Sequence, residues 1–420
     1  MSAPQGHGTG PGARPPARDR ERPPRTRAGA LTAALSAADT DRIVYDLTGI
    51  EGQYDSLLAE LPGTLIRFAL KACPVDEVLT CLADRGAGFD AASPAEIAQA
   101  LRTGVGPGRV HYGNTVKSDQ DIREAHRLGV RTFATDSVED VTAIARHAPG
   151  ARVFCRLATS GQGALWGLNR KFGCAPEDAV RVLETARAAG LTPAGLSVHV
   201  GSQQMTAEGW QAAFDLLADT LTALAGRGIA PDHVNLGGGL PALGYRDRHG
   251  NPLDPPLDKI LTVLREGMER LRALAPVDFV MEPGRHLVAD HGAVRAHVAR
   301  LTRRRQPDGE DAHWLYLSCG KFNGLYEMDQ LTHEMVFPGQ PGTADTVPAI
   351  VAGPTCDSDD AYGEGRHPVR VPVTVTSGDP VWILSAGAYA TSYTTRGFNG
   401  FGPLPCSCVR THHRPDDERP

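Results

Sequence analysis

The feature that most constrains the fold is an alternation of short apolar runs with amphipathic segments between residues 64 and 284. Each apolar run is rich in residue types that favour strands, and each following segment repeats its apolar residues at helical spacing. The expected strands are 64–70, 86–91, 109–113, 131–136, 151–157, 194–200, 232–236 and 277–282. Eight such strands are the number that closes a β/α barrel, whereas doubly wound sheets more often have about five to seven. The pattern therefore predicts a (β/α)8, or TIM, barrel.

The segments between these strands predict the helices of the barrel. They lie at 74–85, 93–104, 118–128, 137–147, 176–190, 206–227 and 257–274. Two of them open on a capping residue, Ser93 with Glu96 three positions on and Ser137 with Asp140. A serine at this position accepts a hydrogen bond from the backbone N–H three residues later, which marks where a helix begins.

A second domain is expected after Arg285, where the alternation of strand-like and helix-like segments ends. Strand-like runs separated by Gly, Pro and Asp turns occur at 285–302, 313–318, 347–352, 369–375 and 380–385. This pattern predicts a mainly antiparallel β domain over residues 285–409. The segment 29–48, which contains RIVYDLT (42–48), is expected to join that domain, so the barrel occupies 49–284.

The ends of the chain and its composition exclude several classes of protein. Residues 1–28 carry six Arg but only one Asp and one Glu, with little to bury, and predict a disordered tail; 410–420 form a second polar tail. A net charge of −6 argues against a nucleic-acid partner. The sequence contains no apolar run of about 18 residues, so no membrane helix is expected. The eight cysteines lack the spacing of zinc ligands, so no metal site is expected. There is no apolar core of a signal peptide, which predicts that the thiols are reduced in the cytoplasm.

Candidate functional residues stand at the carboxyl ends of the predicted strands, where barrel enzymes carry their chemistry. In chain order they are Lys71, Asp90, Arg156, His199, Gly237–Gly239 and Glu282–Arg285. Because burying an ammonium is costly, Lys71 either reaches solvent or forms a Schiff base with a carbonyl cofactor. The glycines either present backbone N–H groups to a phosphate or simply form a tight turn.

Taken together, these motifs resemble the fold-type III pyridoxal-phosphate (PLP) decarboxylases. That family holds the ornithine, lysine, arginine and diaminopimelate decarboxylases on an alanine-racemase-like barrel. The similar segments occur in the family's order and are FALKACP (68–74), GAGFDAAS (86–93), YGNTVKS (112–118), FATDS (133–137), RKFGC (170–174), SVHVGSQ (197–203), LGGGLP (236–241), MEPGRHLVA (281–289), GPTCDSDD (353–360), GAYATSY (387–393) and FNGF (398–401). The sequences of four segments are most similar to those of bacterial ornithine/lysine decarboxylases: YGNTVKS, RKFGC, GKFNGL and GPTCDS. The resemblance implies decarboxylation of ornithine or lysine to the diamine, as in polyamine biosynthesis.

The resemblance also implies roles in the barrel. Lys71 is expected to hold PLP as a Schiff base, Glu282 to face the pyridine nitrogen and keep the ring an electron sink, and His199 to stack on the ring. The expected phosphate contacts are Ser202, Gly238, Gly239, Gly284, Arg285 and Tyr389. Asp90 and Arg156 are expected to support Lys71 and the ring.

The β domain is expected to complete the site. In the family, the loop that contains GPTCD reaches into the barrel of the neighbouring subunit, which implies a homodimer with shared active sites. Cys356 is then the acid that protonates the substrate carbon, and Asp357 meets the distal ammonium of the substrate. Phe398 is also expected at the substrate, and Lys171 is expected to pair with Asp360 across the interface.

Beyond Leu325 the sequence differs from the family's usual residues. In the family, this segment normally supplies a second acidic side chain for the distal amine of the substrate. Asp329 is the candidate for that role, with Glu327 and the neutral Gln330 as alternatives. The substrate therefore stays open between ornithine or lysine and a related amino acid, such as arginine, diaminopimelate, diaminobutyrate or a modified amino acid of specialised metabolism.

Two other functions of the same fold are disfavoured. A racemase is expected to lack the acidic GPTCD loop, which this chain has. An inactive regulatory homologue is expected to lose the lysine or the cysteine, but Lys71 and Cys356 are both present.

Overall fold

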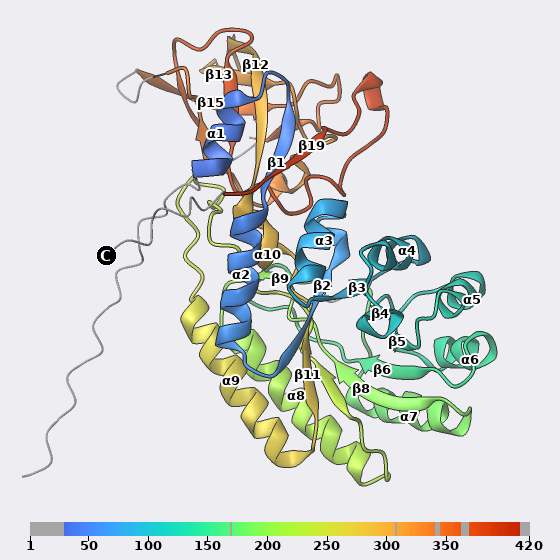
Figure 1. Cartoon of the computed structure of the whole chain (residues 1–420). Helices are drawn as coiled ribbons and strands as arrows, with labels where there is room; N and C mark the ends of the chain where they lie inside the picture. The colour runs from blue at the N-terminus through green and yellow to red at the C-terminus, as the bar shows by residue number, and fades with distance from the viewer. Residues whose placement is uncertain (1–28, 169, 307–308, 341–344, 363–368, 412–420) are drawn as a thin grey trace, which may run out of the picture.

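The computed structural model describes residues 29–168, 170–306, 309–340, 345–362 and 369–411 (Figure 1). The segment 1–28, for which the sequence predicts disorder, lies outside the described residues, and so do residues 412–420 of the second tail. Within the described part, no helix is both long and apolar enough to cross a lipid bilayer.

Eight parallel strands close into a barrel, which confirms the prediction from the alternating pattern. Their order around the ring is β10-β11-β2-β3-β4-β5-β6-β8, so that the first and last strands, β2 and β11, pair and close it. The bounds are β2 (Thr64–Ala69), β3 (Gly88–Ala91), β4 (Val110–Tyr112), β5 (Thr132–Thr135), β6 (Arg152–Arg156), β8 (Thr192–Ser197), β10 (His233–Asn235) and β11 (Asp278–Met281).

The seven predicted helices all form and cover the outside of the barrel (Figure 1). They are α3 (Asp76–Asp84), α4 (Pro94–Arg102), α5 (Asp119–Arg127), α6 (Val138–His147), α7 (Pro176–Ala188), α8 (Glu208–Ala225) and α9 (Leu257–Leu274). Both predicted caps are present, since the Ser93 hydroxyl accepts from the Glu96 N–H and the Ser137 hydroxyl from the Asp140 N–H, each at 3.2 Å. The apolar faces pack against the strands in one continuous core.

The second domain is a nine-stranded, mainly antiparallel sheet. Its strands are β1 (Arg42–Asp46), β12 (Gly292–Arg305), β13 (Asp311–Leu317), β14 (Met335–Val336), β15 (Thr346–Ala352), β16 (Ala361–Tyr362), β17 (Val369–Pro372), β18 (Pro380–Ile383) and β19 (Cys406–Val409). The chain enters through β1, which pairs with β12 antiparallel and with β19 in parallel, so the N-terminal strand lies between two strands from far along the sequence.

The structure corrects several predicted elements. The expected strand 285–302 begins as a helical segment, α10 (Arg285–Val288) and a 3₁₀ turn η3 (Ala289–His291), and β12 starts only at Gly292. A Cβ on Gly292 would lie 2.4 Å from the Cα of Gly387, so the strand starts where two glycines let two backbone segments approach closely. The strand expected at 42–48 ends at Asp46, whose carboxylate accepts from the Gly49 N–H and starts a helix instead.

Seven further α-helices and strands of the described residues were not predicted. They are α1 (Gly29–Ala37), α2 (Leu47–Glu60), the sheet strands β14, β16 and β19, and the hairpin strands β7 (Ala164–Trp166) and β9 (Ser202–Gln204). The hairpin strands are three residues each, which is too short for a period to show in the sequence. Their importance is positional, because they carry Trp166 and Ser202 to the mouth of the barrel.

Candidate active site

A pocket opens at the carboxyl ends of the barrel strands, between the barrel and the β domain. It is lined by Ala69, Lys71, Asp90, His199, Ser202, Gly238, Gly239, Leu240, Glu282, Gly284, Arg285 and Tyr389. Ten of these twelve are residues that the sequence predicts for a cofactor site. The exception among the predicted barrel residues is Arg156, which does not line the pocket; its guanidinium lies over the ring of Phe172 at 5.2 Å.

Lys71 follows β2 in a 3₁₀ turn, η1 (Leu70–Ala72), and its amine lies in the pocket, open to solvent through the mouth. Burial works against the charged form and lowers the pKa of Lys71, but acidic neighbours outweigh this effect and raise the pKa above its ordinary value. These neighbours are Asp90, Tyr389 and Glu282. In the free protein the amine is therefore held as an ammonium inside a negatively charged pocket.

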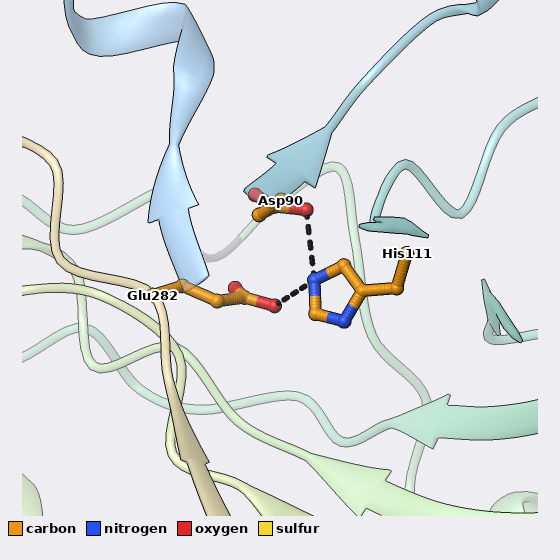
Figure 2. Close-up of side chains that lie close together, drawn as sticks. All are labelled: Asp90, His111 and Glu282. Carbon is orange, nitrogen blue, oxygen red and sulfur yellow. Dashed lines mark hydrogen bonds and ion pairs between the residues drawn. The ribbon is translucent and has the colours of Figure 1, made fainter. Parts of the chain in front are cut away.

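A buried cluster of charged groups lies at the base of this pocket (Figure 2). The Nε2 atom of His111, on β4, lies 3.1 Å from Asp90 Oδ1 and 2.9 Å from Glu282 Oε1. Asn235, at the end of β10, donates from Nδ2 to the same Oε1 atom at 2.5 Å. Neither His111 nor Asn235 was predicted from the sequence, where the only signal was a polar residue inside each of two short apolar strands.

His199 follows β8, and its Nδ1 accepts a hydrogen bond from the Gly201 N–H at 3.1 Å. Burial, followed by the positive charges of Arg156 and Lys71, lowers the pKa of His199 well below its ordinary value. The imidazole is therefore neutral at physiological pH. A neutral ring can lie against a cationic heteroaromatic ring without charge repulsion, which suits the predicted stacking role.

The glycine-rich turn after β10 makes room for a ligand next to the backbone. A Cβ on Gly238 would lie 2.8 Å from the Glu282 carbonyl oxygen, and one on Gly239, whose φ is +114°, would lie 2.6 Å from the Gly201 carbonyl oxygen. Across the pocket, a Cβ on Gly284 would lie 2.8 Å from the Ala72 Cβ. These positions require glycine, and the backbone there can approach a phosphate closely.

Arg285 supplies the positive charge beside this cradle. It makes a two-pronged ion pair with Glu327 of the 3₁₀ turn η4 (Tyr326–Asp329), with N–O distances of 2.5 and 2.6 Å. The same guanidinium donates to the Ser202 hydroxyl at 3.1 Å and to the Tyr245 hydroxyl at 2.9 Å. Burial alone would lower the pKa of Arg285, but Tyr245 and Glu327 raise it, so the charge is permanent.

Aromatic rings enclose the Arg285 guanidinium. Its carbon lies 4.6 Å from the ring centre of Trp166, 4.7 Å from that of Tyr389 and 5.5 Å from that of Tyr245. The faces of these rings attract the cation and fix its plane. Glu327, which the sequence left as an alternative second acid for the substrate, is thus engaged by Arg285 in this structure.

The residues predicted from the β domain line a different cavity, of about 630 Å³, in the same subunit. Cys356, Asp357 and Asp329 all lie there and not in the Lys71 pocket. Cys356 is exposed, and its N–H donates to Asn399 Oδ1 at 2.9 Å. Asp329 pairs with Lys321 at 2.7 Å, so the charge of the predicted substrate acid is partly offset.

Two further predictions concern this face. Phe398, in the 3₁₀ turn η5 (Phe398–Gly400), packs on Phe322 with ring centres 4.7 Å apart and does not line either cavity. The pairing of Lys171 with Asp360 across an interface stays a prediction. Asp360 is only 2% exposed, and its carboxylate accepts from the Lys321 N–H and from the Thr355 N–H and hydroxyl, so it organises its own loop.

Comparison with known proteins identifies this arrangement. The family described as pyridoxal-dependent decarboxylase, pyridoxal binding domain, matches residues 47–289. The chain belongs to the pyridoxal-dependent decarboxylases. It is 29% identical to the lysine/ornithine decarboxylase of Selenomonas ruminantium over 367 residues, which are 86% of this chain and 88% of that protein. It is 27% identical to the ornithine decarboxylase of Schizosaccharomyces pombe, over 87% of this chain and 82% of that protein.

Solved structures agree with the sequence relatives. A lysine decarboxylase from Selenomonas ruminantium aligns with a TM-score of 0.78 at 26% identity, covering 92% of this chain and 96% of that chain. A lysine/ornithine decarboxylase from Vibrio vulnificus, complexed with putrescine, aligns with a TM-score of 0.77 at 26% identity, covering 90% and 97%. The predicted family, the fold and the cofactor are therefore confirmed.

The pocket of this decarboxylase fits PLP. Lys71 would supply the amine that binds the cofactor, and Glu282 would supply an anion for a ring nitrogen. At the other end, the glycine cradle and the Arg285 guanidinium offer a small anion site of the size and charge of a phosphate.

Proposed function

We propose that this PLP-dependent decarboxylase converts ornithine or lysine to the corresponding diamine with release of CO2. The observation that carries the proposal is the presence in one pocket of Lys71, Glu282 and His199 with an anion cradle, together with an acidic loop, Cys356–Asp360, that suits a cationic substrate end. The names of the relatives support it, since they include ornithine and lysine/ornithine decarboxylases.

The residues of the pocket have distinct tasks in this proposal. When bound, PLP accepts the electron pair that remains when CO2 leaves the substrate. Lys71 is the covalent attachment point, and its ammonium must first give up a proton. Glu282 keeps a proton on the ring nitrogen, and the neutral His199 covers one face of the ring. Ser202 and Arg285 hold the phosphate.

The substrate end of the site is proposed to come from a second subunit. Cys356 and Asp357 line a cavity apart from Lys71 in their own chain, and Cys356 is exposed, so neither is positioned to act on that lysine. In a homodimer related by a two-fold axis, each loop can enter the opposite pocket. Cys356 of the partner subunit then protonates the substrate carbon, and Asp357 of the partner subunit pairs with the distal ammonium.

A substrate panel tests the proposed reaction. CO2 release is measured from ornithine, lysine, arginine, diaminobutyrate and diaminopimelate, and the highest kcat/KM is expected for ornithine or lysine. Asp357→Asn should lower that kcat/KM about tenfold to a hundredfold, because one charged hydrogen bond contributes about 1.5–3 kcal/mol. Asp359→Asn is the matched control, since that exposed acid already pairs with Lys321. Preference for arginine or diaminopimelate would refute the substrate assignment.

The attachment point has its own test. Borohydride reduction of the PLP-bound protein, followed by peptide mapping, should place the pyridoxyl group on Lys71. An adduct on any other lysine would contradict the assignment of the pocket.

Mixed dimers test the shared site. Lys71→Ala and Cys356→Ala homodimers should each be nearly inactive. After subunit exchange, half of the dimers are mixed, and one of the two sites in each mixed dimer is intact, so activity should return to roughly a quarter of the wild-type value. If both residues acted from the same subunit, every site would keep one lesion. An absence of recovery, with exchange verified by mass spectrometry, would therefore refute the shared site.

A further inference from the structure

His111 is a buried histidine at the base of the cofactor pocket, and the reaction as described gives it no task. It lies in the middle of β4 and is 1% exposed. In the barrel it is registered directly beside Asp90 on β3, and registered neighbours in a parallel sheet point to the same side. Its ring therefore projects into the barrel together with the Asp90 carboxylate, toward Glu282 (Figure 2).

The geometry of this cluster orients Glu282. His111 Nε2 approaches Glu282 Oε1 at 2.9 Å, and Asn235 Nδ2 donates to the same oxygen. The hydrogen bonds to this carboxylate within the described residues therefore fall on Oε1, and Oε2 is left for the pocket that Glu282 lines. The Asn235 amide, which donates to Oε1, and His111 Nε2, which contacts Oε1 and Asp90 together, hold the plane of the carboxylate, as second-layer contacts hold metal ligands.

The charges of the cluster also require His111. The Asp90 and Glu282 oxygens and His111 Nε2 all lie within 4.8 Å of one another, and two carboxylates this close would tend to share a proton. Burial lowers the pKa of His111, but the hydrogen bonds to both carboxylates raise it above its ordinary value. The two carboxylates that flank the imidazole therefore favour its protonated form.

Other cations act on the same carboxylates, since Lys71 and Arg156 also lower the pKa of Asp90, although less than His111 does. Arg67 on β2 lies close enough to lower the pKa of His111, and His233 on β10 is itself affected by His111. The ring of Phe154 on β6 lies between the two histidines, 5.2 Å from His111 and 5.6 Å from His233. Of these neighbours, His111 is the one with a nitrogen within hydrogen-bonding distance of both carboxylates.

We propose that His111 is a positioning residue for the cofactor: it fixes Glu282 Oε1 and neutralises the Asp90–Glu282 pair, so that Glu282 meets the PLP ring nitrogen as an oriented, ionised carboxylate. The inference rests on the proposed role of Glu282 at that nitrogen. It predicts that a substitution at His111 changes the protonation of the cofactor ring without removing any group that touches PLP.

The experiment uses the holoenzyme loaded with PLP that carries ¹⁵N at the ring nitrogen. The ¹⁵N chemical shift distinguishes a protonated from an unprotonated ring directly and does not depend on turnover. The wild type should show a protonated ring. His111→Leu should move the signal toward the unprotonated position and lower kcat about tenfold to a hundredfold with a smaller change in KM, the scale of one well-placed electrostatic group.

Two further variants make the result interpretable. His111→Gln keeps one N–H donor but loses the charge, so its signal should lie between those of the wild type and His111→Leu; it also gives the test if the leucine variant fails to fold. His233→Leu is the matched control, because it removes a half-buried barrel histidine that makes no hydrogen bond to Glu282 within the described residues. Its ring-nitrogen signal should equal that of the wild type.

The outcomes separate the inference from the proposal on which it rests. An unchanged signal in folded, PLP-bound His111→Leu and His111→Gln, with a changed signal in Glu282→Gln, overturns the role of His111 alone. An unchanged signal in Glu282→Gln overturns the role of Glu282 and the inference with it. Zinc bound stoichiometrically by Asp90, His111 and Glu282 in the purified protein would also overturn the inference, because His111 would then be a metal ligand.

Discussion

The buried ion pair between Arg285 and Glu327 leads to a quantitative prediction about Glu327→Gln. The two side chains are 4% and 11% exposed, and they meet through two hydrogen bonds. Removing one member of such a pair costs about 3–5 kcal/mol, because the remaining charge stays buried without its partner. Here Arg285 keeps its bonds to Ser202 and Tyr245, and each aromatic face contributes about 0.5–2 kcal/mol, so the expected loss is lower.

We expect Glu327→Gln to lower the free energy of unfolding of the cofactor-free protein by about 2–3 kcal/mol. PLP should reverse most of this loss, because its phosphate gives Arg285 a new anionic partner. If the loss falls to about 1 kcal/mol or less in the holoenzyme, linkage requires PLP to bind the variant about tenfold more tightly, since 1.4 kcal/mol is one factor of ten. The charge of Arg285 would thus be shared between Glu327 and the phosphate.

Urea unfolding of both forms at one protein concentration, together with PLP titration of the apoprotein, measures these quantities. Asp329→Asn is the matched control, two positions along in the same turn. Its carboxylate is 38% exposed and pairs with Lys321, so its loss should cost less than about 1 kcal/mol with PLP affinity unchanged. Equal destabilisation of the apo and holo forms of Glu327→Gln, or weaker PLP binding, would refute the reasoning.

Two more predictions concern the cofactor pocket. The pKa of Lys71 is raised, and only the neutral amine attacks the PLP aldehyde, so the rate of PLP incorporation should increase as the pH rises above neutrality. Stopped-flow absorbance measures this rate, and a rate that does not change with pH would contradict the charge assigned to Lys71. Asp90→Asn lowers that pKa and should shift the same rise to lower pH. In Gly113→Ala the new Cβ would lie 1.8 Å from Asp90 Oδ1, so we expect about 1–3 kcal/mol lower stability and weaker PLP binding, whereas Gly108→Ala, with no atom within 4 Å of its Cβ, should change neither.

Much of the fold could be predicted because its information is local. A barrel strand of four to six mostly buried residues and an amphipathic helix each leave a pattern in the sequence, and the serine caps mark where helices start. The barrel side of the site followed from the fold, since Lys71, His199 and Glu282 directly follow strands. Position relative to a strand end made them candidates, and the family resemblance gave them their expected roles.

The rest could not be predicted because it depends on contacts between distant segments. Arg285 and Glu327 are 42 positions apart, and nothing in the local sequence around either residue shows that the two side chains pair. The helix at Arg285–Val288 replaces an expected strand because the chain turns from the barrel into the β domain there. Asp360 looks like an available surface acid in the sequence, but its carboxylate is buried under its own loop.

The cluster around Glu282 shows how much of the site depends on closure of the barrel. Asp90, His111, Asn235 and Glu282 come from β3, β4, β10 and the end of β11, and β10 and β4 meet only because β11 pairs with β2. Each of these four residues comes from a different segment of the chain. With Glu282 in its proposed role, the protonation state of the PLP ring reports on the closed barrel as a whole. The proposed substrate acid Asp357 instead depends on the β domain and, in the proposed dimer, on a second chain. Variants in the barrel should accordingly change the cofactor spectrum first, and variants in the loop should change substrate choice while the spectrum stays the same.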